Sequence, residues 1–246
     1  MLKTPLEEVL AARKSVRHFS SEPIRFEELS AILYHTWGRI SYYKTPEFGV
    51  LLHKSSPSAG ARHPTEVYVV ANNVAEIRKG IYHYSVKTNS FELLKAGDFR
   101  RRCLEYCAGR IWGENAAALF ITTSVVARTT WKYRVARTYR TLMLDVGHLS
   151  QTFYLVCTAL GLGPFCTGVT CDIVIEKDLG IDGVNETIMF VTGVGTKEWV
   201  PTDATVTEKL QETQIWLVQI LSNSPSNLAL RKSYKNGMRA ISDKKN

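Results

Sequence analysis

The longest regular pattern in the chain covers residues 135–160 and predicts one long helix that ends at Gly161. Its apolar side chains do not form a single stripe. Leu142 and Phe153 mark one face, whereas Leu144 lies away from it. A helix that is apolar on several sides must be covered on several sides. We therefore expect this helix at the centre of the core or at a dimer interface.

Shorter apolar and β-branched segments surround this helix and predict strands. The segments 66–70, 116–124 and 187–192 are candidate strands, and 81–84 with 91–94 predicts a hairpin. Further helices are expected at 26–37, 99–107 and 173–179, and a polar, aromatic loop at 39–56. Because strands and helices do not alternate regularly as βαβ units, the sequence favours an α+β sandwich.

A basic segment at residues 13–17, RKSVR, follows a helix whose start is predicted from a capping box at Thr4 and Glu7. Guanidinium groups and a hydroxyl are suitable donors to phosphate oxygens. A solvated basic helix end explains the same composition. The candidate phosphate ligands are Arg13, Ser15 and Arg17.

Composition bounds the remaining classes of function. The 246 residues are 45% hydrophobic and 22% charged, with a formal net charge of +8. No apolar run is long enough to cross a bilayer and no signal peptide is evident, so we expect a cytoplasmic protein without a membrane partner. Much of the positive charge lies at 100–102 and 231–245, and no alternation of aromatic and basic residues predicts nucleic-acid binding.

The five cysteines show no metal-ligand spacing, and Asp145 and His148 lack a third ligand, so no metal site is predicted. We expect one domain at residues 1–200. A C-terminal helix at 205–221 and a basic tail, within residues 201–246, would pack on a partner subunit.

Residues 57–64, PSAGARHP, run directly into the strand at 66, and small residues there allow close approach to a flat ligand. Together with RKSVR, this segment resembles the flavin mononucleotide (FMN) site of the nitroreductase superfamily. More closely, the chain resembles the SagB/McbC-type azoline dehydrogenases over about residues 5–198. Further matching segments are GIYHY at 80–84, LDVGHL at 144–149, ALGLG at 159–163 and VG at 194–195.

The resemblance implies a central antiparallel or mixed sheet flanked by helices, an obligate homodimer and FMN as cofactor. Arg13, Ser15 and Arg17 would bind the flavin phosphate, with Lys197 as a second phosphate partner. The residues implied to contact the flavin from the second subunit are Pro57, Ser58 and Ala59.

The segment PFCTG at 164–168 matches the loop that passes over the isoalloxazine, where backbone N–H groups face the N5 edge. This implies that Thr167 and Gly168 contact the cofactor. Here Cys166 stands where relatives commonly have proline, and Val169 where they often have glycine.

Lys132 and Tyr133 match the Lys-Tyr pair of the azoline dehydrogenases, which ordinary nitroreductases lack. Forming an azole from an azoline removes a proton and a hydride, so a base is needed beside the flavin. Burial or the flanking Arg128 and Arg134 would lower the lysine pKa enough for this role. Tyr133 would orient the ring or share the proton.

We therefore expect an FMN-dependent oxidase that converts thiazoline or oxazoline rings to thiazole or oxazole on a peptide or carrier-bound intermediate, with O₂ reoxidising the flavin. Its partners would be a second copy of the chain and a cyclodehydratase or carrier protein. Three alternatives remain open. The chain could be an NAD(P)H-dependent nitro or quinone reductase, a flavin-binding scaffold subunit of a biosynthetic complex or, from charge alone, a nucleic-acid-binding module.

Overall fold

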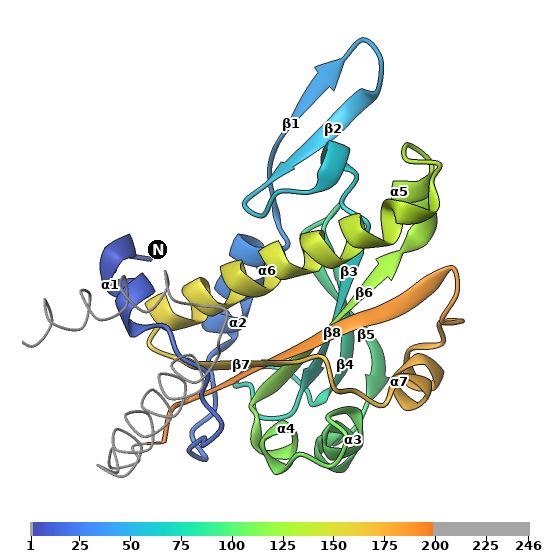
Figure 1. The fold of residues 1–246 in the computed structure, drawn as a ribbon. Helices are drawn as coiled ribbons and strands as arrows, with labels where there is room; N and C mark the ends of the chain where they lie inside the picture. The colour runs from blue at the N-terminus through green and yellow to red at the C-terminus, as the bar shows by residue number, and fades with distance from the viewer. Residues whose placement is uncertain (1, 199–246) are drawn as a thin grey trace, which may run out of the picture. The chain divides into compact units, whose positions relative to one another are not determined.

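The computed structural model describes residues 2–198, which are built on one six-stranded sheet in the order β5-β4-β3-β6-β8-β7 (Figure 1). All neighbouring strands in it run antiparallel. The predicted α+β class and antiparallel sheet are therefore confirmed. The strands are β3 (Thr65–Ala71), β4 (Gly80–Ser85), β5 (Ser90–Ala96), β6 (Ala118–Val125), β7 (Gly163–Thr167) and β8 (Glu186–Gly195).

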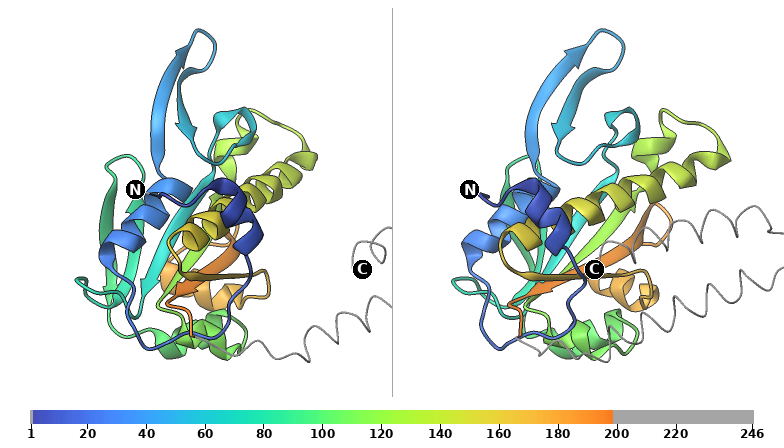
Figure 2. Two further views of the ribbon diagram at one scale, coloured as in Figure 1. Left: turned by 90° about the vertical axis from the view of Figure 1, so that its left-hand side faces the viewer. Right: turned by 60° about the vertical axis from the view of Figure 1, so that its left-hand side comes forward.

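Helices cover both faces of the sheet, so the described part of the chain has three layers (Figures 1 and 2). One face carries α1 (Leu6–Ala12), α2 (Phe26–Thr36) and α6 (Tyr139–Ala159). The other carries α3 (Arg100–Tyr106), α4 (Ile111–Asn115) and α7 (Asp172–Leu179). A short helix, α5 (Val126–Thr130), follows β6.

The central strands β3 and β6 are mostly apolar because both of their faces are buried. In β3, Val67 and Val69 pack toward α2 and α6, whereas Tyr68 and Val70 pack toward α3. This is the alternation expected when side chains point to opposite faces of a strand. The predicted strand at 66–70 is confirmed, with one further residue at each end.

The predicted helix at 135–160 is present as α6, preceded by a 3-10 turn at Ala136–Thr138. Gly161, with φ of 78°, follows its end, as expected of a glycine stop. In the single chain its buried side chains face mainly the sheet, and Gly147, His148 and Gln151 near its middle are exposed, so the expected burial on several sides is not seen in one copy. Met143 and Leu144 are likewise 59% and 64% exposed in the single chain.

A two-stranded hairpin stands where the sequence predicted a loop, formed by β1 (Arg39–Thr45) and β2 (Gly49–Lys54). It projects beyond the end of the main sheet (Figure 1). Because six of the seven residues of β1 are exposed, its sequence carries no apolar alternation. The hairpin is held by backbone pairing, which composition does not reveal.

Three further expectations need correction or fall outside the described residues. The Thr4 hydroxyl donates to the Ala159 carbonyl at 3.3 Å, and α1 begins at Leu6 without a side-chain cap, so the predicted capping box was wrong. The segment 164–168, expected as a loop, lies mostly in β7. The predicted helix at 205–221 and the boundary of the tail at 201–246 lie outside the residues described.

Candidate functional site

The basic segment at 13–17 leaves α1 directly after Ala12 and runs beside β7. The Val16 N–H donates to the Pro164 carbonyl at 2.8 Å, which fixes the backbone of the segment against the sheet edge. Arg13 is half-buried and Arg17 is exposed. The segment is therefore a loop held against the sheet edge, with one half-buried and one exposed arginine.

The structure brings Lys197 to this same segment. Phe19 and Lys197 form a β-bridge just after β8. A Cβ on Gly163 would lie 2.8 Å from Val16 Cγ1 and 3.2 Å from Lys197 Cγ, so both side chains pack over that glycine. Burial and the nearby Lys14 ammonium lower the pKa of Lys197. Lys197, the predicted second phosphate partner, thus lies beside the segment that carries Arg13, Ser15 and Arg17.

These cations have no carboxylate partner within the part of the chain that the structure describes. Every ion pair there joins other residues, and Arg13, Arg17 and Lys197 occur in none of them. Like charges held together without counter-charges repel one another and attract an anion. The arrangement fits a phosphate group and is less well explained as a solvated helix end.

A buried carboxylate in the N-terminal half of α6 holds the loop at 57–63 by hydrogen bonds. Asp145 accepts hydrogen bonds from the Ser58 hydroxyl at 2.5 Å and from the Ala59 N–H at 3.2 Å. The Ser58 oxygen also accepts the His63 N–H at 2.9 Å. Burial raises the pKa of Asp145. Because the Ser58 hydroxyl is engaged as donor and acceptor, it shapes this loop, while Pro57 is exposed.

The backbone of this loop takes conformations that most residues avoid. Gly60, Ala61 and His63 have φ of 60°, 52° and 44°. Side chains with a Cβ are strained in this region, and such strain concentrates at functional sites. The bonds from Asp145 hold the loop in this form.

Lys132 and Tyr133 lie in the turn after α5, between β6 and α6, as predicted. The Tyr133 N–H donates to the Thr129 carbonyl at 3.0 Å, and the Thr138 hydroxyl donates to the Tyr133 carbonyl at 2.7 Å. Both side chains reach Gly60. A Cβ there would lie 2.8 Å from the Tyr133 oxygen and 3.2 Å from Lys132 Nζ. The predicted catalytic pair therefore converges on the predicted cofactor-binding loop.

An aromatic ring that sequence reasoning missed lies against the lysine. Lys132 Nζ is 4.0 Å from the centroid of Phe48, which lies in the turn between β1 and β2. Arg62 Cζ is 5.9 Å from the same centroid and 5.1 Å from that of Trp131. The hairpin thus supplies a cation–π partner to the candidate base.

The arginines that flank Lys132 in sequence are not its neighbours in this cluster. Arg128 instead pairs with Glu66 at 2.5 Å, and Glu66 also bonds His83 at 2.9 Å. Arg134 is exposed. The cation that shares the Phe48 ring with Lys132 is Arg62, which comes from the loop after Gly60.

Thr167 ends β7 and Gly168 follows it, so both lie at the exit of an edge strand. The Thr167 hydroxyl accepts the Val169 N–H at 3.0 Å and is thereby used within the turn. Gly168 is exposed, with no atom within 4 Å of its missing side chain. Its backbone is thus open to approach by a ligand.

The two groups of candidate residues follow α1 and α5, and these helices lie toward opposite ends of α6 in one chain (Figure 1). Asp145 holds the loop that contacts Lys132, and Tyr154 contacts Ser15 and Arg13. Nine residues correspond to about two and a half turns and roughly 13 Å of helix, so these side chains leave α6 on opposite sides. A single copy does not unite the two groups.

Residues 10–196 match the profile of the Nitroreductase family. The chain belongs to the nitroreductase family. Members of this family depend on FMN.

Two curated relatives agree with this membership. A nitroreductase-family protein of Methanocaldococcus jannaschii is 33% identical over 176 residues, which span 72% of this chain and 84% of the relative. A trifolitoxin-processing protein of Rhizobium leguminosarum biovar trifolii is 30% identical over 154 residues, which span 61% of this chain but only 40% of that protein.

Among solved structures, the Escherichia coli microcin synthetase complex, with a truncated pro-microcin bound, contains a chain of the same fold. The TM-score is 0.62 at 19% identity, and the match covers 74% of this chain and 68% of that chain. At this identity the likeness establishes the nitroreductase fold alone.

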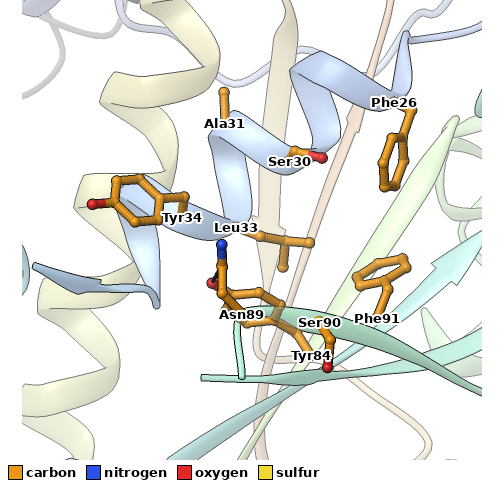
Figure 3. A pocket seen from close by; sticks show the side chains of 9 residues that line it. All are labelled: Phe26, Ser30, Ala31, Leu33, Tyr34, Tyr84, Asn89, Ser90 and Phe91. Atoms are coloured by element: carbon orange, nitrogen blue, oxygen red, sulfur yellow. Dashed lines mark hydrogen bonds between the residues drawn. The ribbon is translucent and has the colours of Figure 1, made fainter. Parts of the chain in front are cut away.

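Other features of this nitroreductase-family chain stand apart from these residues. A cavity of about 300 Å³ lies between α2 and the β4–β5 hairpin (Figure 3). None of the predicted site residues and no charged side chain lines it. Its lining residues are Phe26, Ser30, Ala31, Leu33, Tyr34, Tyr84, Asn89, Ser90 and Phe91.

Within the described residues, 2–198, no three His, Cys, Asp or Glu side chains gather in a way that could hold a metal ion. Over the same range, no helix is both long and apolar enough to span a bilayer.

Proposed function

We propose that the chain is an FMN-dependent oxidase that converts thiazoline or oxazoline rings to thiazole or oxazole in a peptide or carrier-bound intermediate. The observation that carries this proposal is the convergence of Lys132 Nζ and Tyr133 on Gly60. A proton acceptor and a phenol thus lie together on the loop that the family resemblance assigns to the cofactor.

The residues present fit FMN. Arg13, Arg17 and Lys197 are cations that form no ion pair with a carboxylate among the described residues. Ser15 adds a neutral hydrogen-bond donor, and these four side chains together suit a phosphate dianion. Gly168 and the glycine-containing loop at 57–60 offer exposed or half-buried backbone for a flat ring.

A homodimer is part of this proposal because, within one chain, the candidate phosphate ligands lie far along α6 from the Lys132 group, which is Lys132 and Tyr133 with the loop at 57–60. A second copy related by a twofold axis would place one chain's 57–60 loop beside the other's Arg13. The exposed apolar side chains on α1 and α6 suit such an interface. They are Leu6, Leu10, Tyr139, Met143 and Leu144.

Oxidation of an azoline to an azole removes one proton and one hydride from the ring. Bound FMN would supply the hydride acceptor. Lys132 Nζ, in its neutral form, takes the ring-carbon proton, and the Tyr133 hydroxyl lies close enough to the same spot to orient the ring or share that proton. The Phe48 ring, whose centroid is 4.0 Å from Lys132 Nζ, also confines the lysine.

The substrate class is supported by one of the curated relatives. The 30%-identical protein of Rhizobium leguminosarum biovar trifolii is, by name, a trifolitoxin-processing protein. We propose that this chain acts on a modified peptide, or on a carrier-bound intermediate, delivered by a cyclodehydratase or carrier protein.

The test begins with the absorption spectrum of the purified full chain and identification of the chromophore that heat releases. FMN near one copy per chain is expected. Turnover of a thiazoline peptide should then fall by about a hundredfold or more in Lys132→Ala, the usual scale of a lost general base. Lys87→Ala, an exposed lysine in the β4–β5 turn, is the matched control.

Two results would contradict the proposal. A chain that neither contains nor takes up FMN is not this oxidase. A chain that binds FMN, leaves thiazolines unchanged and reduces nitroaromatics or quinones with NAD(P)H at an undiminished rate in Lys132→Ala is a reductase.

A further inference from the structure

A buried phenol lies directly beneath the basic segment. Tyr154, on α6, is 5% exposed, and its hydroxyl oxygen is 2.8 Å from the Ser15 hydroxyl oxygen. Its ring lies under the Arg13 guanidinium, with Cζ 5.4 Å from the centroid. One side chain therefore contacts two of the residues that the resemblance assigned to the phosphate. It lies 139 positions from Ser15 in the chain, and no local motif pointed to it.

We infer that Tyr154 is a positioning residue for a phosphate group, donating its O–H to Ser15 so that the Ser15 proton is free for a phosphate oxygen. This inference rests on the proposed function, since the phosphate considered is that of FMN. It assigns to α6 a role in ligand binding beyond its role in the core.

The direction of the hydrogen bond follows from counting protons. A serine hydroxyl has one proton, and a phosphate dianion only accepts hydrogen bonds. If Ser15 donated to Tyr154, it would have nothing to donate to the anion. If Tyr154 donates, the series runs from phenol to serine to phosphate, and each bond polarises the next.

Tyr154 is suited to remain the donor. Burial and the neighbouring Cys166 thiol raise its pKa to about 12, so it keeps its proton throughout the physiological range.

The ring and the hydroxyl can be separated experimentally. Tyr154→Phe keeps the ring that supports Arg13 and fills the core, and it removes only the hydrogen bond to Ser15. Ser15→Ala removes the same bond from an exposed position, where folding is not at risk. Tyr84→Phe is the matched control, because the Tyr84 hydroxyl is also buried but donates to Asn89 at 2.5 Å, outside this segment.

The measurement is the dissociation constant of the full-length, flavin-free chain for FMN and for riboflavin, which lacks the phosphate, followed by flavin fluorescence. Tyr154→Phe and Ser15→Ala should each weaken FMN binding by about three- to tenfold, the scale of one hydrogen bond. Riboflavin binding should change less than about twofold. The double variant should lose less than the product of the two single losses.

Several results would overturn the inference. If Tyr154→Phe weakens the binding of FMN and of riboflavin equally, the phenol has only a structural role. If the dissociation constant for FMN is unchanged in Tyr154→Phe or in Ser15→Ala, the proposed series of hydrogen bonds from Tyr154 through Ser15 to the phosphate does not exist. If the wild-type chain binds neither flavin, the proposed function fails and this inference fails with it. If it binds both with equal strength, only the phosphate role fails.

Discussion

At the scale of single residues, the site depends on polar side chains that hold backbone loops in place. Asp145 is the clearest case, since it bonds both the Ser58 hydroxyl and the Ala59 N–H while nearly buried. A buried carboxylate is costly unless its oxygens are hydrogen-bonded. Its two bonds offset that cost and fix a loop with three positive φ angles.

Asp145→Asn should lower the free energy of unfolding by about 1–3 kcal/mol, because an amide has one acceptor oxygen and turns its N–H₂ toward a donor. Chemical denaturation measures this change. Asp98→Asn, which breaks an exposed pair with Lys79, should cost less than about 1 kcal/mol. Equal losses in the two variants would show that the Asp145 bonds contribute nothing special.

The ion pair between His83 and Glu66 gives a pH-dependent contribution to stability. The hydrogen bond to Glu66 raises the pKa of His83 above its ordinary 6.5. The stabilisation is therefore complete below pH 6.5 and is lost as the pH rises through the raised value.

The wild type should exceed His83→Gln in unfolding free energy by more at pH 6 than at about pH 9. Urea titrations across that range measure the difference between the two proteins. A difference that stays constant with pH would show that folding does not raise the pKa of His83.

At the scale of elements, the sequence predicted those whose side chains face a core. The strands at 66–70, 81–84 and 116–124 and α6 carry apolar patterns because packing demands them. The partner strand at 91–94 was predicted as well, although most of β5 is exposed. The β1–β2 hairpin is almost wholly exposed, and β7 begins with Gly-Pro, so neither has such a pattern. The missed hairpin also explains why Phe48 was not foreseen beside Lys132.

The same distinction applies to the site. Arg13, Ser15, Arg17, Lys132 and Tyr133 lie in short motifs that can be recognised locally. Asp145 and Tyr154 act through contacts that span 87 and 139 positions, which only the packing of α6 brings together. A sequence pattern predicts residues that lie in local motifs, but it contains little information on residues that act through such distant contacts.

The hairpin should affect catalysis through Phe48. Phe48→Leu keeps an apolar side chain but removes the π face 4.0 Å from Lys132 Nζ, an interaction of about 0.5–1 kcal/mol. We expect kcat for an azoline to change by about two- to fivefold with little change in flavin binding. Tyr42→Leu, an exposed position on the same hairpin, is the control. Identical kinetics in both variants would dissociate the hairpin from the site.

At the scale of the whole molecule, the proposal requires two copies of the chain. The segment with Arg13 follows α1 and the turn with Lys132 follows α5, and these two helices lie toward opposite ends of α6 (Figure 1). Exposed apolar side chains lie on α1 and α6. Each flavin would then be held by both chains. Dimer formation and cofactor binding should accordingly be coupled.

Leu144→Lys tests this coupling. A lysine is well tolerated at an exposed position of a single chain but costly in an apolar interface, so the dimer should dissociate at least about tenfold more readily and FMN binding should weaken with it. Ile173→Lys, on α7 in the opposite layer and 81% exposed, should change neither. Sedimentation velocity with and without FMN is the measurement. A Leu144→Lys chain that remains dimeric and fully flavin-bound would contradict this arrangement.

The most direct test of the central claim is the anaerobic reaction of the FMN-loaded chain with a thiazoline peptide, followed through the visible absorption of the flavin. We predict that the peptide alone bleaches the flavin, that thiazole forms in equal amount, and that Lys132→Ala slows the bleaching by about a hundredfold. Bleaching by NAD(P)H but not by the thiazoline, or a rate unchanged in Lys132→Ala, would contradict the account.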